Sequence, residues 1–192
     1  MTDVFEVLKK DHEEVKDMLS ELGDGPTAAS GATAAQLAER KRLVDNLIRE
    51  ESRHEVAEQQ YFWPALRQLG PEGDRIADQA LEQETEGEKA LDALDSLAPD
   101  DQRFESVLAT FISDARAHIA FEEAHAWPLL SASLSQQESA ELGDKITRAK
   151  KMAPTRPHPN VPPQPGTLKT AGPAVAAADK LRDAMRDRNQ HD

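Results

Sequence analysis

Residues 54–64 read HEVAEQQYFWP, and residues 118–128 read HIAFEEAHAWP. Both stretches follow the pattern H-x3-E-x4-W-P, so the chain carries an internal repeat. Positions i and i+4 of an α-helix lie one turn apart on the same face, and each repeat therefore presents an imidazole and a carboxylate to one point. Two such helices side by side supply four groups of the kind that bind metal ions.

Apolar residues at helical spacing place these groups in the interior. Steps of three and four residues back along the chain lead from His118 to Phe111, and from His54 to Leu47. An ionised carboxylate that is buried without a partner costs several kcal/mol, whereas a cation neutralises it and fixes the imidazoles. The repeat therefore predicts a metal site within the core.

A third histidine strengthens this interpretation. His12 lies on the same side of its predicted helix as Leu8, Val15 and Leu19, so it also faces inward. The alternative is that each histidine is a core residue hydrogen-bonded to a neighbouring glutamate, which a single H-x3-E would favour. Duplication of the pattern, together with His12, favours a metal.

The rest of the chain predicts an all-α protein. Apolar residues recur at helical spacing between Gly- and Pro-containing breaks, and no sustained strand alternation occurs. The expected helices run from about Asp3 to Leu22, Ala34 to Leu69, Ile76 to Pro99, Phe104 to Leu129 and Ser135 to Lys151. Thr33 with Gln36 and Ser135 with Glu138 form capping-box patterns at two of the starts.

The C-terminal part has a different character. Residues 152–192 hold a Pro-rich linker followed by a marginal helix from about Val175 to Arg188, whereas residues 1–151 form the predicted domain. Residues 1–149 carry 15 Lys and Arg against 32 Asp and Glu, while residues 150–192 carry 8 against 4. Electrostatic docking of this basic tail on the acidic domain is therefore one expectation, and a semi-rigid linker or strap without a packed element is the other.

Composition narrows the classes of function. The net charge of -13 disfavours nucleic acid and anionic membrane surfaces as partners. The chain has no cysteine, which excludes thiolate metal sites and disulfides. Neither a signal-peptide pattern nor a run of 18 apolar residues is present, so a cytoplasmic location is expected.

These motifs resemble the hemerythrin-like, or HHE cation-binding, family over roughly Met1 to Leu130. The family pattern has a His on helix 1, H-x3-E on helix 2, usually a His on helix 3, and H-x3-E on helix 4. The matching residues here are His12, His54, Glu58, His118 and Glu122. The resemblance implies an up-down-up-down four-helix bundle, here with an additional C-terminal helical stretch. It also implies two iron ions bridged by Glu58, Glu122 and an oxo or hydroxo group.

The third helix departs from the family pattern because it has no histidine. Glu84 lies about as far after the Gly70–Pro71 turn as the middle of His54–Glu58 lies before it, so antiparallel helices bring these residues level. Glu84 is therefore the predicted replacement ligand. Alternatively, the run of glutamates around it is a solvated helix face and the ligand is missing.

Three further residues are candidates for an outer role or for additional ligands. Tyr61 and His125 occupy equivalent positions seven residues after each repeat histidine, and Glu55 lies off the main face. Trp63-Pro64 and Trp127-Pro128 are expected to lie at the ends of packed layers of the bundle and to take no part in the chemistry.

Mixed histidine and carboxylate ligands suit iron or manganese better than zinc or calcium. A carboxylate in place of an imidazole favours the ferric state and makes reversible oxygen carriage less suitable. The expected function is a non-haem di-iron protein that reacts with or senses oxygen, peroxide or nitric oxide. Its activity would be peroxidase- or catalase-like, or would detoxify nitric oxide. The alternative is a non-enzymatic iron-binding or sensing module whose tail signals to a partner.

Overall fold

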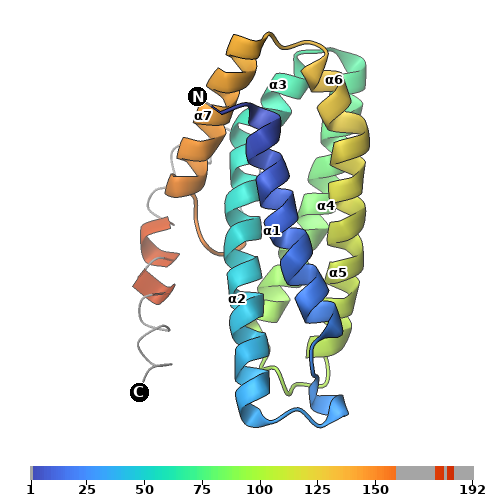
Figure 1. Cartoon of the computed structure of the whole chain (residues 1–192), viewed down its shortest axis with the longest axis vertical. Helices are drawn as coiled ribbons and strands as arrows, with labels where there is room; N and C mark the ends of the chain where they lie inside the picture. Colours follow the sequence, from blue (N-terminus) through green and yellow to red (C-terminus); the bar gives the residue numbers. More distant parts are fainter. Residues whose placement is uncertain (1, 159–175, 180, 184–192) are drawn as a thin grey trace.

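Four long antiparallel helices form the body of the protein. The computed structural model describes residues 2–158, 176–179 and 181–183, and the described residues form helices and no strands. Helices α1 (Val4–Asp24), α2 (Ala34–Ala57), α4 (Pro71–Ser96) and α5 (Phe104–Phe121) run alternately down and up the bundle (Figure 1). The predicted all-α class and up-down-up-down bundle are thus confirmed.

Shorter segments extend and connect these helices. A 3-10 turn, η1 (Ala28–Ser30), lies between α1 and α2. Helix α2 continues through a π-helical segment, η2 (Glu58–Phe62), into α3 (Trp63–Arg67). Helix α5 continues in the same way through η3 (Glu122–Ala126) into α6 (Trp127–Ser131), and α7 (Gln136–Met152) follows.

Local capping explains where the helices start. The Asp3 side chain accepts a hydrogen bond from the backbone N–H of Phe5, and Thr33 and Ser135 each begin a reciprocal capping box. The two predicted capping boxes are therefore present. Gly70, with φ +89, makes the turn into Pro71 in a region of φ and ψ that is unfavourable for other residues.

Two apolar clusters fill the bundle, one toward each end. Phe62, Trp63 and Leu66 lie in the first cluster, near α3 and α6. Leu47 and Phe104 lie in the second, toward the opposite end of the bundle. Each long helix passes from one cluster to the other, and the polar residues of the repeat lie between them. The apolar clusters thus enclose a polar layer.

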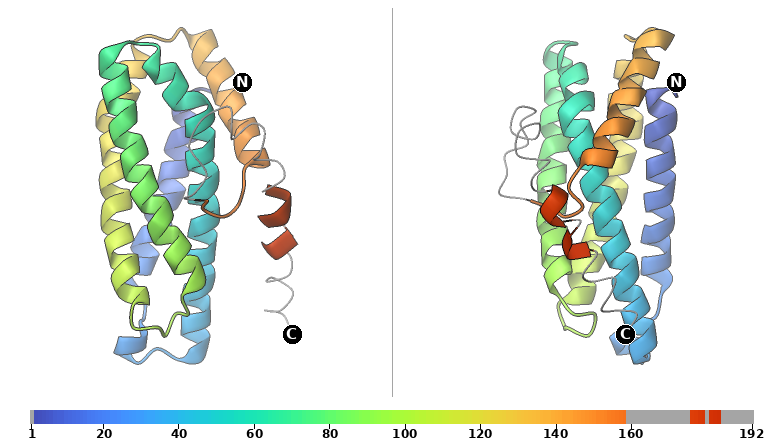
Figure 2. Two further views of the ribbon diagram at one scale, coloured as in Figure 1. Left: turned by 180° about the vertical axis from the view of Figure 1, so that it is seen from behind. Right: turned by 90° about the vertical axis from the view of Figure 1, so that its left-hand side faces the viewer.

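Helix α7 packs along α1 and α2 and covers one side of the bundle (Figure 2). A Cβ atom at Gly143 would lie 2.3 Å from the Thr2 carbonyl oxygen, so a larger residue would force α7 away from the N-terminus. Residues Ala153–Arg156 then continue along the bundle and are buried. This part of the predicted linker or strap is therefore packed against the bundle.

Arg156 explains this burial. Its guanidinium is 3% exposed and lies 2.6 Å from Asp95 Oδ1 on α4 and 2.6 Å from Asp183 Oδ1 near the C-terminus. Among the described residues of the tail, Arg156 and Asp183 are therefore held by charge, as the charge distribution allows. Residues 176–179 and 181–183 are helical, and the rest of the predicted terminal helix lies outside the described residues. None of the helices described here is long and apolar enough to cross a bilayer.

Candidate metal centre

All four long helices contribute to the polar layer. His12 comes from α1, His54 and Glu58 from α2 and its π-helical continuation, Glu84 from α4, and His118 and Glu122 from α5 and its continuation. Glu58 and Glu122 have no exposed surface, and all the others except the half-buried His118 are buried. The structure brings together all six residues that the sequence predicted as ligands.

These residues form two overlapping clusters. One contains His12 and His54, the other contains Glu84 and His118, and Glu58 and Glu122 belong to both. In each cluster, one ligand atom from every residue lies within 4.8 Å of the others. Glu122 faces one histidine with each oxygen: Oε2 is 3.0 Å from His12 Nε2, and Oε1 is 3.1 Å from His118 Nε2.

The clusters have the donor atoms that a cation requires. His12 Nε2, His118 Nε2 and both oxygens of Glu58 and Glu122 are buried without a hydrogen-bond partner. The distances of about 3 Å between some of these atoms are thus close ion-pair contacts without hydrogen-bond geometry. Buried polar groups are rarely left unsatisfied, and a metal ion would satisfy several of these at once. The residues present therefore fit a bound metal.

The other ring nitrogen of each histidine has a partner from a different position in the fold. The Nδ1 contacts are Glu123 at 3.0 Å for His12, Asp11 at 3.4 Å for His54 and Gln83 at 2.9 Å for His118. An acceptor at Nδ1 favours the tautomer whose Nε2 lone pair points into the cluster. Each imidazole is thus oriented for metal binding.

Two of these partners, Glu123 and Asp11, each contact a lysine farther from the polar layer. Lys16 Nζ donates to Glu123 at 2.7 Å, and Lys150 Nζ lies 2.5 Å from Asp11 Oδ1. Because Lys150 belongs to α7, this helix is connected to His54 through the Asp11 carboxylate. Asp11 and Glu123 are sequence neighbours of predicted ligands, but only the packing of helices against each other shows which atoms they meet.

Both tryptophans of the repeat contact predicted ligands, which their sequence pattern did not indicate. Trp63 Nε1 donates to Glu84 Oε1 at 2.5 Å, and Gln59 Nε2 donates to Glu84 Oε2 at 2.7 Å. Trp127 stacks on His12, with 4.9 Å between ring centroids and 20° between the planes. Glu84 is therefore held by both of its oxygens and is not part of a solvated face.

The π-helical segments explain what happens to Tyr61 and His125. Trp63 N–H donates to the Glu58 carbonyl and Trp127 N–H to the Glu122 carbonyl, five residues back instead of four. The extra residue in each π-helical turn changes the direction in which the side chains of the turn point, compared with a regular α-helix. His125 consequently lies exposed beside Phe121, and Tyr61 is half-buried against the apolar cluster. His125 belongs to neither cluster of the polar layer.

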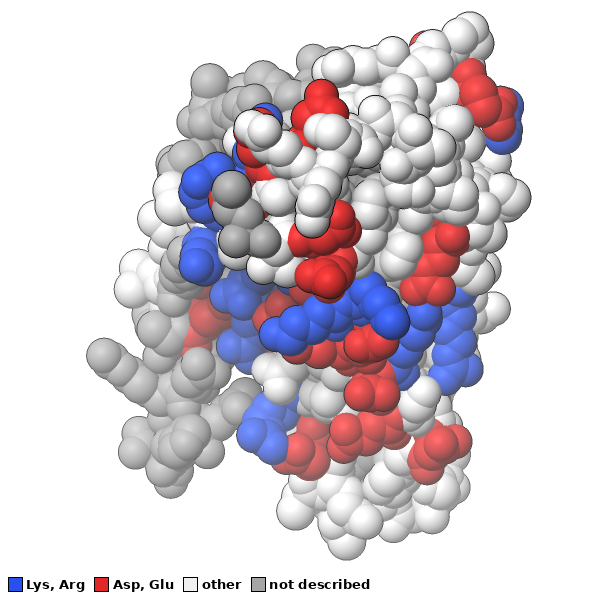
Figure 3. All heavy atoms as spheres, turned by 45° about the horizontal axis from the view of Figure 1, so that its top comes forward, with Lys and Arg blue, Asp and Glu red and all other residues white. Residues whose placement is uncertain are grey.

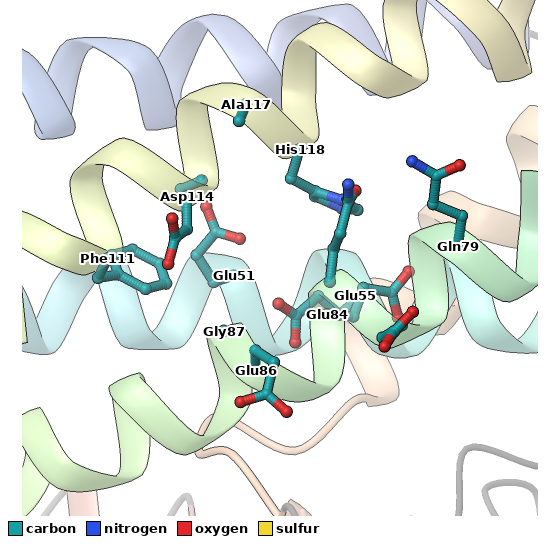
Figure 4. A pocket seen from close by; sticks show the side chains of 13 residues that line it. Glu51, Glu55, Gln79, Glu84, Glu86, Gly87, Phe111, Asp114, Ala117 and His118 are labelled. Carbon is teal, nitrogen blue, oxygen red and sulfur yellow. The ribbon is translucent and has the colours of Figure 1, made fainter.

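A cavity of about 420 Å³ reaches the polar layer between α4 and α5 (Figure 4). Of the six predicted ligands, Glu84 and His118 line it. The third outer candidate, Glu55, lies there with Glu51, one turn earlier on α2. Glu51 was not predicted, although its position three residues before His54 could have indicated it. Burial raises the pKa of both Glu51 and Glu55.

Protons compensate part of the buried charge in the metal-free protein. Burial raises the pKa of Glu84 to about 8, and the neighbouring Glu58 carboxylate contributes to this rise. Burial alone would lower the pKa of His118, but Glu122 and the other carboxylates raise it to about 9. Burial opposes ionisation of Glu122 too, yet His118 and His12 keep its pKa well below the usual range. A metal bound here would therefore compete with protons.

Fold and site together define a helical bundle whose interior presents a histidine and glutamate cluster suited to cation binding. The family model for the hemerythrin HHE cation binding domain matches residues 3–130. The chain belongs to this family, and metal binding is the property that the family and the cluster have in common.

Relatives extend the match beyond the four-helix region. A hemerythrin-like protein of Schizosaccharomyces pombe is 29% identical over 96% of this chain and 87% of its own length. The crystal structure of a hemerythrin HHE cation binding domain-containing protein from Mycobacterium kansasii is similar with a TM-score of 0.64. It is 22% identical and covers 93% of this chain and 99% of its own, so it supports the fold, including helices beyond residue 130.

Proposed function

We propose that this protein binds two iron ions in the polar layer. His12 and His54 would hold one iron, Glu84 and His118 the other, and Glu58 and Glu122 would bridge them. The observation that carries this proposal is that the two clusters share these two fully buried carboxylates. A single ion would leave one of the two histidine-containing clusters without a cation.

The donor set supports iron as the metal. Three imidazoles and three carboxylates are a mixture of nitrogen and hard oxygen donors, which suits iron or manganese. Zinc favours closed four-coordinate sites with sulfur or nitrogen, and calcium favours oxygen alone. Glu84 provides a carboxylate where the family usually has a histidine, which favours the ferric state and disfavours reversible oxygen carriage.

We further propose that the centre reacts with or senses oxygen, peroxide or nitric oxide. Iron bound here would supply redox and Lewis-acid chemistry toward these small molecules. The cavity gives access to the half that contains Glu84 and His118, whereas neither His12 nor His54 lines it. Gln59 and Trp63 hold the Glu84 carboxylate in place, and Gln83 orients His118. The chain thus leaves one half of the site accessible and keeps its ligands rigid.

Metal analysis combined with reactivity tests this proposal. The protein would be loaded with ferrous ion without oxygen, desalted, and analysed for iron per chain before and after exposure to peroxide or nitric oxide. We expect two irons per chain and consumption of at least one of these molecules above the rate with free iron. A content of one iron, or none, contradicts the paired centre.

The contact from α7 supports a second candidate function, a non-enzymatic iron or oxygen sensor. Lys150 on α7 meets Asp11, which meets His54, so a change at this histidine can affect the helix that leads to the docked tail. Two irons without turnover of any tested molecule would favour this function. Iron-dependent protection of residues 153–158 from hydrogen exchange would support it directly.

A further inference from the structure

Most of the charged residues that line the cavity between α4 and α5 are acidic. Six acidic residues line it: Glu51, Glu55, Glu82, Glu84, Glu86 and Asp114. Its lining includes no Lys or Arg within the described parts of the chain. By contrast, on the face in Figure 3 blue and red side chains lie next to each other. The cavity is therefore a local region of negative potential that attracts cations.

Glu51 and Glu55 are the unusual members of this lining. They are 7% and 4% exposed, and neither forms a hydrogen bond or an ion pair with any residue in the described part of the chain. They lie one turn apart on α2, which puts their Cβ atoms roughly 6 Å from each other, and both side chains project into the cavity (Figure 4). Two largely buried carboxylates that face a cavity and have no cationic partner from the protein are suited to a positive ligand in that cavity.

Their place in the cavity suggests where such a ligand comes from and where it goes. Glu82, Glu86 and Asp114 are exposed and lie on the outer part of the lining. Glu84 and His118, which belong to the proposed iron centre, form its inner part. Glu51 and Glu55 are the buried acidic groups of the lining that belong to neither set. They are thus suited to bind a cation between solvent and the centre.

Gly87 keeps this passage open. A Cβ atom at this position would lie 3.7 Å from Glu55 Oε1 and 3.8 Å from the Phe111 ring. Glycine is unfavourable in the interior of a helix, and Gly87 lies well within α4. The absence of a side chain leaves space directly against one of the two carboxylates. A larger residue here would extend from the α4 side into the cavity.

We propose that Glu51 and Glu55 form a transit site for a partly hydrated divalent cation, through which metal passes to the Glu84 and His118 half of the centre. This inference rests on the proposed iron centre. Two carboxylates and several retained water molecules are a common set of ligands for a hard divalent ion that binds weakly. Such a site accelerates loading and does not hold metal at equilibrium.

The test compares the rate of loading with the final content. Metal-free Glu51→Gln/Glu55→Gln protein and wild type would be mixed with ferrous ion without oxygen. A chromogenic chelator would capture the unbound iron at timed intervals. The matched control is Glu39→Gln/Glu50→Gln, which removes two carboxylates from the outer surface of the same helix, where each pairs with an arginine. Circular dichroism verifies that each variant is folded.

We expect the Glu51→Gln/Glu55→Gln protein to load at least tenfold more slowly than wild type and the control, and to reach the same final iron content. Gly87→Leu should also load slowly because its side chain occupies the passage. Equal loading rates for Glu51→Gln/Glu55→Gln and wild type contradict the transit site, even if Gly87→Leu is slow. No iron uptake by wild type contradicts the proposed centre itself, and the transit site with it.

Discussion

The indole of Trp63 on α3 donates a hydrogen bond to Glu84 on the adjacent helix α4, with 2.5 Å between Nε1 and Oε1. This contact joins the Trp-Pro end of the first repeat to the position where the family pattern usually has a histidine. The π-helical turn that begins at Glu58 places Trp63 five residues later, where its side chain reaches α4. The replacement of histidine by Glu84 and the Trp-Pro motif therefore belong to one arrangement.

Substitution of Trp63 by phenylalanine should weaken the half of the centre that contains Glu84. The substitution keeps an aromatic ring but leaves Oε1 without its donor, and loss of a group that orients a ligand typically lowers metal affinity by about 10- to 100-fold. We expect Trp63→Phe to retain the more tightly bound iron and to lose the other during dialysis. Trp127→Phe is the matched control, because it keeps an aromatic ring beside His12 and Trp127 Nε1 has no hydrogen-bond partner to lose. Equal iron loss from both variants would count against a specific role for Trp63.

The helices and the inner ligands could be predicted from sequence because they depend on local periodicity. An H-x3-E pair faces one way whatever surrounds it, and apolar neighbours show that this direction is inward. The directions of the Tyr61 and His125 side chains depend on the π-helical turns, and the i, i+4 spacing in the sequence does not predict such turns. Gln83 could not be chosen among several polar residues of α4, because its contact with His118 is set by how two helices pack.

The metal-free protein should lose stability as pH rises from about 5 to 9. The pKa of Glu84 is raised to about 8 and that of His118 to about 9, so the folded state retains protons that the unfolded chain releases at lower pH. Stability therefore decreases through this interval. Thermal unfolding of the metal-free protein at a series of pH values measures the trend.

Iron should remove most of this pH dependence, since bound metal takes the place of the protons. Loading near pH 7 should also release protons, which a pH indicator in weak buffer detects. Metal-free Glu84→Gln provides a second comparison, because the amide cannot ionise and its stability should fall less between pH 5 and 8. If the metal-free and loaded proteins showed parallel pH profiles, the retained protons would not be those that metal displaces.

Arg156 should contribute strongly to stability despite its position after the last bundle helix. Removing one partner of a buried ion pair costs about 3–5 kcal/mol, because the opposing charges remain buried. In Arg156→Met, Asp95 and Asp183 would lose a guanidinium that lies 2.6 Å from each of them. We expect a lower midpoint in urea denaturation and faster hydrogen exchange in residues 153–158. Arg148→Met, which changes an exposed arginine of α7, is the control and should unfold like wild type.

Asp11→Asn tests whether the outer contacts tune the His12 and His54 half of the centre. The Asp11 carboxylate accepts from His54 Nδ1 and pairs with Lys150, so it both fixes the tautomer of this imidazole and connects it to α7. An asparagine amide has no charge and can present its N–H₂ to Nδ1, which would favour the wrong tautomer. We expect ferrous affinity at this half to fall about 10- to 100-fold, while iron on the Glu84 side stays bound. Asp17→Asn removes an exposed carboxylate from the same helix and should leave both affinities unchanged. Equal weakening of both halves would contradict a role of Asp11 that is confined to the orientation of His54.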